Sequence, residues 1–364
     1  MHIEAGRHCY GGARQVEYLI DGLSQRGVDN VLLCPPEQPL ASRLQRAEII
    51  PVPMGGEHDL GMGLRFSRLL AGLDPDVVHV HSRRGADLYG GLAAALARRP
   101  AVLTRRVQSH EPKLWARFKY RPYRAIVAIS RAVEAELERA GVVSARRCII
   151  PSAVDARRFV PRHDAARRLR QALGLAEHAF VVGLVAQLIP RKGHRLALSV
   201  MQRLGARHPN LMLVCFGRGP EEAVLREAVT ARGLAGRVVL AGFRDDLASL
   251  LSGIDVLIHP ASREGLGVAV LEAMSAERPV VAARVGGLVD LIESGHDGVL
   301  VPAGDADAFA AAVSDLIAAP ERRRRLGQAA RARVERDFSV AAMSDAYLDL
   351  YRSLRETRRA VLRS

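Results

Sequence analysis

Short apolar runs alternate with amphipathic stretches along almost the whole chain. The runs are rich in Val, Ile and Leu with little alternation, which is typical of parallel strands buried on both faces. They are NVLLCP (30–35), DVVHVHS (76–82), AVLT (101–104), AIVAIS (125–130), CIIPSAV (148–154), FVVGLVAQ (180–187), LMLVCFG (211–217), RVVLAGF (237–243), DVLIHPA (255–261), PVVAARV (279–285) and GVLVPA (298–303). Stretches of helical length between the runs predict doubly wound α/β sheets. The runs are too many for one open sheet, so the pattern predicts two.

The predicted domain boundary lies in PSAVDARRFVPR, which has the character of a loop. We therefore expect a first domain at 1–152 and a second at 153–337. The stretch 338–364 carries Met343, Tyr347 and Tyr351 at helical spacing, which predicts a helix that crosses back onto the first domain. The first strand, HIEA (2–5), is cut short before a glycine turn. Either this strand is truly short or the first element begins elsewhere.

The composition fits a folded enzyme-sized protein. The 364 residues are 49% hydrophobic, which allows large cores and argues against disorder. There is no run of 18 apolar residues and no basic-then-apolar leader, so we expect a cytosolic protein. The four cysteines, Cys9, Cys34, Cys148 and Cys215, form no CxxC pair, which argues against a zinc knuckle or a disulfide framework.

The net charge of +14 is unevenly spread, and only Lys113, Lys119 and Lys192 of the 53 basic residues are lysine. Between Arg98 and Arg124 nine residues are basic and one is acidic. Here KLWARFKYRPYRA (113–125) places the single tryptophan among basic residues. This pattern suits an anionic membrane surface or an acidic acceptor. It equally suits a surface helix whose aromatic residues pack inward. Nucleic-acid binding is a further alternative, but no motif supports it.

The strongest chemical signal is REGLGVAVLEAM, in which seven residues separate Glu264 from Glu272. A strand precedes this stretch, and a helix is predicted from Gly267, so the loop lies at the carboxyl edge of a parallel sheet, where ligands bind. The start of a helix suits phosphate. A diphosphate held there would bring a ribose beside Glu272 and a sugar beside Glu264. The alternative is that the two glutamates belong to a solvated helix face.

Several motifs together carry a resemblance that runs the full length of the chain. They are GGARQVEYLIDGLSQRG, DVVHVHS, AIVAISRAVEAEL, IPRKG, FGRGPEE, REGLGVAVLEAM followed by PVVAARVGG and GVLVPAGD, and FSVAAMSDAYLDLY. The chain resembles the retaining glycosyltransferases of family 4, in particular those that build bacterial lipopolysaccharide and other cell-surface glycans. The resemblance implies the GT-B fold, in which two Rossmann-like domains face a central cleft.

The resemblance also implies roles for individual residues. Glu272 would bind the ribose, Glu264 the donor sugar, and Lys192 the diphosphate leaving group. The implied donor-binding residues are Gly11, Gly12, Gln187, Arg191, Lys192, Gly217, Phe243, Arg244, Glu264, Gly265, Leu266, Gly267, Val268 and Glu272.

The chain departs from the family pattern at two positions. Gln187 stands where many members have arginine, so Lys192 and Arg191 would carry more of the charge. Leu103 stands where many members have the active-site histidine. His81 and Asp87 are the nearest replacements, and we favour Asp87 as the residue that orients the acceptor. For His79, two residues before His81, we favour packing in the core.

The expected reaction is transfer of a hexose-type unit from a nucleotide sugar, most simply a UDP-sugar, to a lipopolysaccharide-core or similar acceptor. The alternative within the same fold is a nucleotide-sugar epimerase or hydrolase. We expect no cofactor and no metal, because both DxD triplets have the character of a turn or a helix cap. We expect no nucleic-acid partner, and a location at the inner face of the cytoplasmic membrane. The predicted acceptor or membrane residues are Arg105, Arg106, Lys113, Trp115, Arg117, Lys119 and Arg121.

Overall fold

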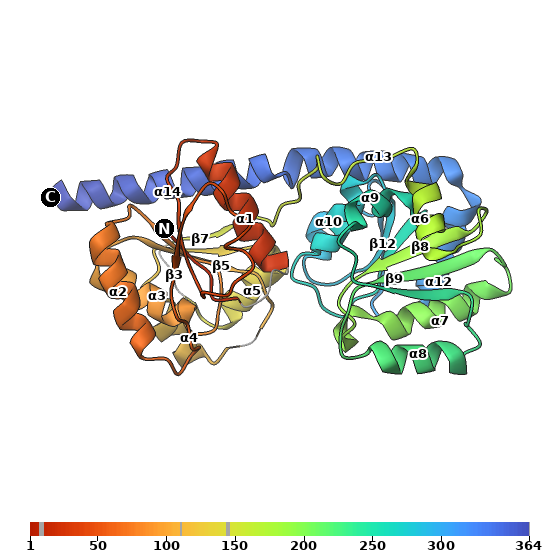
Figure 1. The fold of residues 1–364 in the computed structure, drawn as a ribbon, viewed down its shortest axis with the longest axis horizontal. Helices are drawn as coiled ribbons and strands as arrows, with labels where there is room; N and C mark the ends of the chain where they lie inside the picture. Colours follow the sequence, from red (N-terminus) through yellow and green to blue (C-terminus); the bar gives the residue numbers. More distant parts are fainter. Residues whose placement is uncertain (7–10, 110, 143–145, 364) are drawn as a thin grey trace. The chain divides into compact units, whose positions relative to one another are not determined.

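The computed structural model describes residues 1–6, 11–109, 111–142 and 146–363 (Figure 1). The chain forms two compact units. Unit 1 comprises residues 1–153 and 340–364, and unit 2 comprises residues 154–339. The first change of unit, between Ala153 and Val154, lies one residue from the predicted boundary. The last helix belongs to unit 1.

Within the described residues, unit 1 contains a seven-stranded parallel sheet in the order β3-β2-β1-β4-β5-β6-β7. The strands are β1 (His2–Ile3), β2 (Val31–Cys34), β3 (Glu48–Pro51), β4 (Val78–Val80), β5 (Ala101–Arg105), β6 (Ala125–Ala128) and β7 (Arg147–Ile149). The chain builds outward from β1 in one direction and from β4 in the other. The topological switch point, where such sheets bind ligands, therefore lies between β1 and β4.

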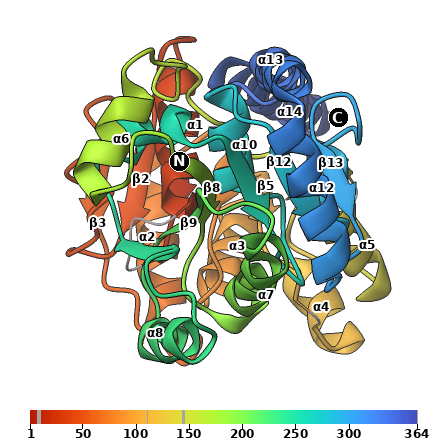
Figure 2. The same ribbon diagram turned by 90° about the vertical axis from the view of Figure 1, so that its right-hand side faces the viewer.

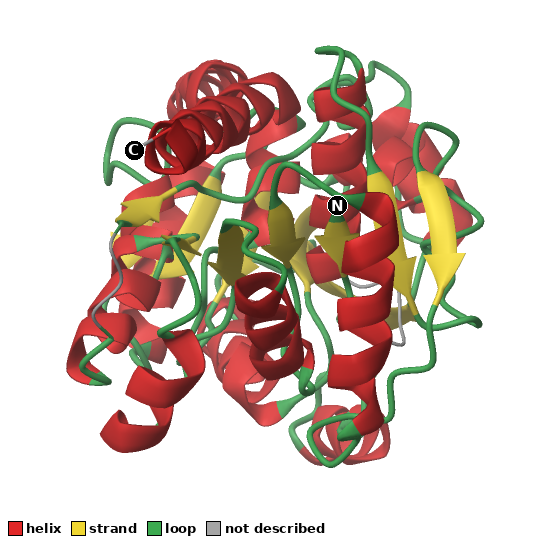
Figure 3. Cartoon of the chain, turned by 90° about the vertical axis from the view of Figure 1, so that its left-hand side faces the viewer, coloured by secondary structure: helices red, strands yellow, loops and turns green. Residues whose placement is uncertain are grey.

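Helices cover both faces of this sheet (Figure 3). They are α1 (Gly11–Ser24), α2 (Gly61–Leu73), α3 (Ala86–Leu96), α4 (Lys113–Tyr120), α5 (Arg131–Arg139) and α14 (Val340–Arg363). α1 packs against α14, and α3 contacts both α2 and α4. The apolar side chains of α1 and α14 join those of β5 and β6 in one core, which includes Leu19, Val102, Val127, Met343 and Tyr347. The C-terminal segment thus completes unit 1.

Unit 2 has a six-stranded parallel sheet in the order β10-β9-β8-β11-β12-β13 (Figure 2). The strands are β8 (Phe180–Val185), β9 (Leu211–Phe216), β10 (Val238–Gly242), β11 (Val256–His259), β12 (Val280–Ala283) and β13 (Val299–Val301). The same reasoning places its switch point between β8 and β11.

Helices flank this second sheet as well. They are α6 (Ala165–Leu173), α7 (His194–Gly205), α8 (Glu222–Ala231), α9 (Leu247–Leu250), α10 (Val268–Ser275), α11 (Leu288–Leu291), α12 (Ala306–Ala318) and α13 (Pro320–Asp337). Short 3₁₀ turns are η1 (Pro190–Lys192) and η2 (Leu251–Gly253). Figure 1 shows α7, α8 and α12 on one face and α6, α9, α10 and α13 on the other. The doubly wound α/β architecture predicted from the sequence is confirmed in both units.

Each of the eleven predicted apolar runs overlaps an observed strand, and HIEA contains the two-residue β1. β3 was not predicted, because its sequence EIIP is short, only partly buried and ended by proline, as edge strands often are. Cys34, Cys148 and Cys215 are free, and Cys9 lies outside the described residues. Within the part of the chain that the structure describes, no helix has the length and apolar character required to cross a membrane.

Candidate functional site

Three polar side chains meet at the switch point of unit 2. Lys192 ends η1, just after β8, and Glu264 lies in the loop after β11. The Lys192 ammonium donates to Glu264 Oε2 in an ion pair. Nε2 of His259, the last residue of β11, lies 2.8 Å from the same oxygen. Lys192 and His259 therefore both contact one oxygen of the Glu264 carboxylate. Oε1 takes part in neither interaction.

The loops that carry these groups are held together by their backbones. Gly193 has a φ of +77°, and a Cβ added there would lie 2.0 Å from the Pro260 carbonyl oxygen. Glycine is thus required where the loop after β8 touches the loop after β11. The Ser262 N–H donates to the Arg191 carbonyl oxygen at 2.9 Å. These contacts fix Lys192 opposite Glu264.

The loop after β12 supports Glu264 from a second side. Gly286 has a φ of +51°, and a Cβ added there would lie 2.0 Å from the Glu264 carbonyl oxygen. The N–H of Gly287 donates to the same oxygen at 3.0 Å. The VGG sequence after the strand is therefore explained by close backbone approach to Glu264.

The charge of Glu264 is stabilised although the side chain is largely buried. Burial opposes ionisation, but the hydrogen bond with His259 and the charge of Lys192 outweigh it and hold the pKa of Glu264 well below its usual range. His194, 2% exposed, has a pKa lowered to about 4 by burial and by the neighbouring His259 and Lys192. Neither nitrogen of His194, nor Nδ1 of His259, has a hydrogen-bond partner among the described residues. The site thus combines a cation, an ionised carboxylate and two buried imidazoles.

The helix that follows supplies the second glutamate. The sequence predicted that the helix starts at Gly267. In the structure α10 begins one residue later, at Val268, and Gly267 precedes it with a φ of +111°. Glu272 lies in the second turn of this helix and is 7% exposed. The predicted anion-binding segment Gly265, Leu266, Gly267 and Val268 therefore runs from the loop into the N-terminus of α10, as the sequence indicates.

The other predicted donor-binding residues of unit 2 lie around the carboxyl ends of β8, β9 and β10. Gln187 and Arg191 are exposed. Gly217 has a φ of +143°, and a Cβ there would lie 1.9 Å from the Ala186 carbonyl oxygen. Phe243 is 51% exposed, with the Arg218 guanidinium 5.8 Å from its ring centroid.

The remaining donor candidates are Arg244, Gly11 and Gly12. Arg244 makes an ion pair with Asp246 at 2.7 Å. Gly11 and Gly12 are exposed residues at the start of α1 in unit 1. Their predicted roles toward a donor stay predictions.

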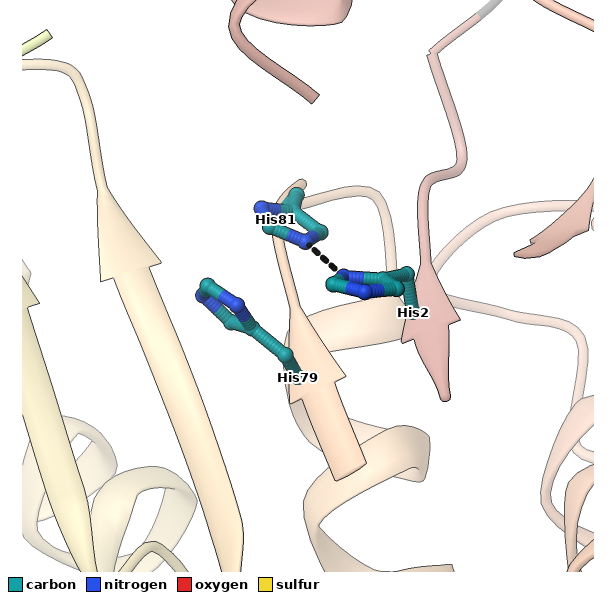
Figure 4. A group of neighbouring side chains, drawn as sticks. All are labelled: His2, His79 and His81. Atoms are coloured by element: carbon teal, nitrogen blue, oxygen red, sulfur yellow. Dashed lines mark hydrogen bonds between the residues drawn. The ribbon is translucent and has the colours of Figure 1, made fainter. Parts of the chain in front are cut away.

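Three buried histidines lie at the switch point of unit 1 (Figure 4). The strand register pairs His2 with His79, and His81 follows two residues later, so all three rings face one side of the sheet. Each is at most 4% exposed. The sequence predicted that His79 packs in the core and that His81 is a candidate for the active site. The structure buries both, because side chains two residues apart on a strand share a face.

Hydrogen bonds define the arrangement of these rings. His2 Nε2 lies 2.9 Å from Asn30 Oδ1, so the neutral ring accepts at Nδ1, where His81 Nε2 donates at 2.9 Å. His81 Nδ1 then accepts from Arg106 at 3.2 Å. His79 is bonded separately, to Thr104 at 2.7 Å and Tyr351 at 2.5 Å. Ligand atoms of the three rings lie within 4.8 Å of one another, but a cation there would replace these hydrogen bonds and face the Arg106 guanidinium.

Burial sets the protonation of this cluster. It lowers the pKa of His2 to about 3 and the pKa values of His79 and His81 well below their ordinary value. His81 is therefore a neutral ring with both nitrogens occupied. Its predicted catalytic role stays untested.

Asp87, the favoured acceptor-orienting residue, lies in the first turn of α3 and is 1% exposed. Its Oδ2 lies 2.5 Å from Lys119 Nζ in an ion pair. Lys119 also donates to Glu111 at 3.1 Å, and Glu111 accepts from the Tyr120 hydroxyl at 2.6 Å. Arg105 completes this charged network, 3.4 Å from Glu111.

The predicted basic surface is therefore smaller than the sequence indicated. Arg105 and Lys119 are buried, at 5% and 3% exposure, because Glu111 and Asp87 pair with them. The remaining members, Lys113, Trp115, Arg117 and Arg121, are exposed along α4 and just after it, and Arg106 is half-buried. Sequence reasoning missed Glu111, His194 and His259. His259 could have been found from its place at the end of a strand, five residues before Glu264.

Comparison with known proteins gives consistent results. The family model for glycosyl transferases group 1 matches residues 166–333, and that for glycosyltransferase family 4 matches residues 10–158. The chain is similar to 2-deoxystreptamine N-acetyl-D-glucosaminyltransferase of Streptomyces fradiae, with 33% identity over 280 residues that cover 70% of this chain and 66% of that protein. It is also similar to the lipopolysaccharide core biosynthesis glycosyltransferase LpsE of Rhizobium meliloti, with 33% identity over 184 residues that cover 50% of this chain and 53% of that protein.

Solved structures support the same fold. Anabaena Alr3699/HepE, in complex with UDP and glucose, superposes with a TM-score of 0.84 at 21% identity, over 97% of this chain and 98% of that one. The alignment with the Streptomyces fradiae protein spans slightly less than two thirds of that protein's length. The alignment with LpsE spans about half of LpsE. The two family models together span most of the chain, and the chain folds into two Rossmann-like units. The chain therefore belongs to glycosyltransferase family 4 and has the GT-B fold.

Proposed function

We propose that this glycosyltransferase moves a hexose-type unit from a UDP-sugar to a hydroxyl group of a cell-envelope glycan or glycolipid, such as lipopolysaccharide core. We further propose retention of the anomeric configuration, without a metal ion or a cofactor. The observation that carries the proposal is the cluster of Lys192, Glu264 and His259 at the switch point of unit 2, beside the N-terminus of α10.

The donor fits this cluster by charge. A diphosphate would lie at the start of α10, where backbone N–H groups and the helix dipole favour an anion. Lys192 would leave Glu264 for the diphosphate, and His259 would keep the carboxylate in place. Glu264 Oε1 would then accept from a sugar hydroxyl, and Glu272 would accept from the ribose.

The proposed reaction needs no strongly basic side chain. The bond between the anomeric carbon and the phosphate oxygen breaks as the acceptor oxygen bonds to the same face of the sugar. The proton of the acceptor hydroxyl passes to the departing phosphate oxygen. Lys192 would stabilise the negative charge that develops on that phosphate, as preorganised cations do in low-dielectric sites.

The acceptor class has two supports. The name of LpsE places that relative in lipopolysaccharide core biosynthesis. α4 exposes Leu114, Trp115 and Phe118 together with Lys113 and Arg117, which is the composition of a helix that lies on an anionic membrane. We therefore propose peripheral binding at the inner face of the cytoplasmic membrane. Salt-sensitive binding to anionic vesicles, without retention of single-stranded RNA, is the expected result.

Thermal unfolding with UDP, GDP and ADP tests the donor site. A ligand that binds the folded state raises its stability by mass action. We expect UDP to raise the unfolding temperature of the wild type and not that of Glu272→Ala. The absence of a rise with every nucleotide, in a folded protein, would refute the donor site.

Product analysis tests the reaction itself. NMR of the glycoside should show the anomeric configuration of the donor, and chelation with EDTA should leave the rate unchanged. An altered sugar formed from donor alone would instead identify an epimerase, and free sugar a hydrolase.

A further inference from the structure

Two buried histidines of unit 2 lie behind Glu264, and the donor chemistry uses only one of their four ring nitrogens. His194 begins α7 and is 2% exposed, and His259 ends β11 and is 1% exposed. Nε2 of His259 contacts Glu264. Nδ1 of His259 and both nitrogens of His194 have no hydrogen-bond partner among the described residues. Burying polar atoms without partners costs stability, so these three nitrogens require an explanation.

The backbone brings the two rings into one region. β8 and β11 are neighbouring strands, so the loops that follow them meet at one edge of the sheet. Gly193 precedes His194, Pro260 follows His259, and a Cβ added at Gly193 would lie 2.0 Å from the Pro260 carbonyl oxygen. Each histidine is therefore one residue away from this backbone contact. The rings are close enough that His259 contributes to the lowered pKa of His194, after the larger effect of burial.

The rest of α7 indicates that packing alone does not require an imidazole at its first position. The other buried residues of this helix are small or apolar, and they are Ala197, Leu198, Val200, Met201 and Leu204. An apolar side chain at position 194 would continue this face without burying two polar nitrogens. A polar partner therefore explains His194 better than the core does.

The donors and acceptors of the two rings are complementary. The ionised carboxylate of Glu264 only accepts, so His259 donates to it from Nε2. A neutral imidazole that donates at one nitrogen accepts at the other, which makes Nδ1 of His259 a buried acceptor. His194 offers an N–H donor, because burial lowers its pKa to about 4 and keeps the ring neutral at pH 7. A buried water typically bridges polar groups of this kind.

We propose that His194 is a positioning residue that acts on Glu264 through one bound water and His259. The water accepts from the N–H of His194 and donates to Nδ1 of His259, which holds His259 in the orientation and tautomer that donate to Glu264. As a device for sugar transfer, this relay rests on the function proposed above. It matters most when Lys192 leaves Glu264 for the diphosphate, because His259 is then the one of the two contacts that stays on Oε2.

Nuclear magnetic resonance tests the relay without any ligand. Nitrogen-15 spectra of protein labelled in histidine distinguish protonated from unprotonated ring nitrogens, and His259→Gln assigns the signals. We expect wild-type His259 to be protonated at Nε2 and unprotonated at Nδ1. In His194→Leu the Nδ1 signal of His259 should shift, because its hydrogen bond is lost. A wild-type His259 protonated at Nδ1, or an unchanged Nδ1 signal in His194→Leu, overturns the proposal.

Transfer assays measure what the relay does for the reaction. His194→Leu should lower kcat about tenfold, because Glu264 is no longer held in one orientation toward the sugar. Its Kd for UDP should stay unchanged, since UDP lacks the sugar that Glu264 contacts. Its unfolding temperature should not fall, because an apolar side chain replaces a buried polar one. His194→Gln keeps an N–H donor and should recover most of kcat.

Two outcomes of these assays would overturn the relay. One is a wild-type kcat in His194→Leu, and the other is an equal loss of kcat and of UDP affinity, which is the result expected of a purely structural residue. His208→Gln is the matched control, because His208 lies just beyond the other end of α7 and contacts Ser314 at 3.1 Å. It should keep the wild-type kcat and the wild-type signals of His259. If the wild type binds no UDP, the donor site is refuted, and the spectra still decide whether the relay exists.

Discussion

At the scale of single residues, the fold holds charged side chains in fixed pairs. Lys192 and His259 share one oxygen of Glu264, and Asp87 shares Lys119 with Glu111. The first arrangement keeps a carboxylate ionised in a largely buried position. Removing Lys192 should therefore change the binding of an anionic ligand, whereas removing one partner of the buried Lys119–Asp87 pair should cost stability.

Lys192→Met tests the donor site at this scale. The variant keeps the length of the side chain but removes the cation, so Glu264 retains His259 and a diphosphate loses its counter-charge. We expect the transfer rate to fall by about 10²–10³-fold, as for other electrostatic contacts to a developing charge. The measurement is release of UDP in the presence of acceptor.

Arg157→Met is the control, because Arg157 is a basic residue of unit 2 whose side chain is 92% exposed. It should keep the wild-type rate of transfer. A normal rate in Lys192→Met would contradict the assignment.

The buried histidines predict sensitivity to acid. In the unfolded chain histidine binds a proton near pH 6.5, whereas folded His2 resists protonation down to about pH 3, and His79 and His81 resist it likewise. The contribution of these neutral histidines to the free energy of unfolding is therefore fully present above pH 6.5. It falls as the pH drops toward 3, by up to about 1.4 kcal/mol per pH unit for each histidine. Denaturant unfolding of unit 1 at pH 7, 6 and 5 measures this loss.

His79→Gln should reduce the slope of stability against pH, because one titrating ring is gone. His178→Gln changes an exposed histidine of unit 2 and should leave the slope unchanged. If the slope of stability against pH is the same in His79→Gln and in the wild type, the pKa of His79 in the folded protein is not lowered.

At the scale of elements, the sequence predicted almost every strand because parallel strands leave near-continuous apolar runs. It missed β3, whose four residues lie at the sheet edge. The helix after Glu264 was predicted because a glycine and a proline bound it. The side-chain contacts could not be predicted from the sequence, because strand order and helix packing bring Lys119 to Asp87 and His2 to His81.

Gly286→Ala tests how these elements hold Glu264. The added methyl would lie 2.0 Å from the Glu264 carbonyl oxygen, so the loop after β12 must shift. We expect weaker binding of UDP together with a loss of stability greater than the strain of a positive φ alone.

Gly295→Ala is the matched control, since Gly295 has a φ of +90° and open space around it. It should cost stability through backbone strain only and keep the affinity for UDP. Isothermal titration with UDP compares the two variants, and equal affinities would exclude the proposed support of Glu264.

At the scale of the whole molecule, the two units should respond separately to ligand and to mutation. The proposed donor cluster of Lys192, His259 and Glu264 lies in unit 2, so we expect UDP to raise the unfolding temperature of unit 2 more than that of unit 1. Tyr347→Ala removes a fully buried ring of α14 and should lower the stability of unit 1 by about 3–5 kcal/mol. Calorimetry measures both transitions.

Asp349→Ala is the control on the same helix, because Asp349 is exposed. Its two transitions should match those of the wild type. A single transition that moves with both UDP and Tyr347→Ala would show that the units unfold together.

The path of the chain has a consequence for synthesis on the ribosome. Unit 1 begins at the first residues, but α14, which supplies Met343 and Tyr347 to its core, emerges only after all of unit 2. Until then the apolar side of β5 and β6 lacks its last cover. Domains usually fold in the order of translation. Here unit 2, with all its residues in one segment, can complete its core first. The first half completes its core only after α14 has emerged, and we expect it to expose apolar surface in that interval.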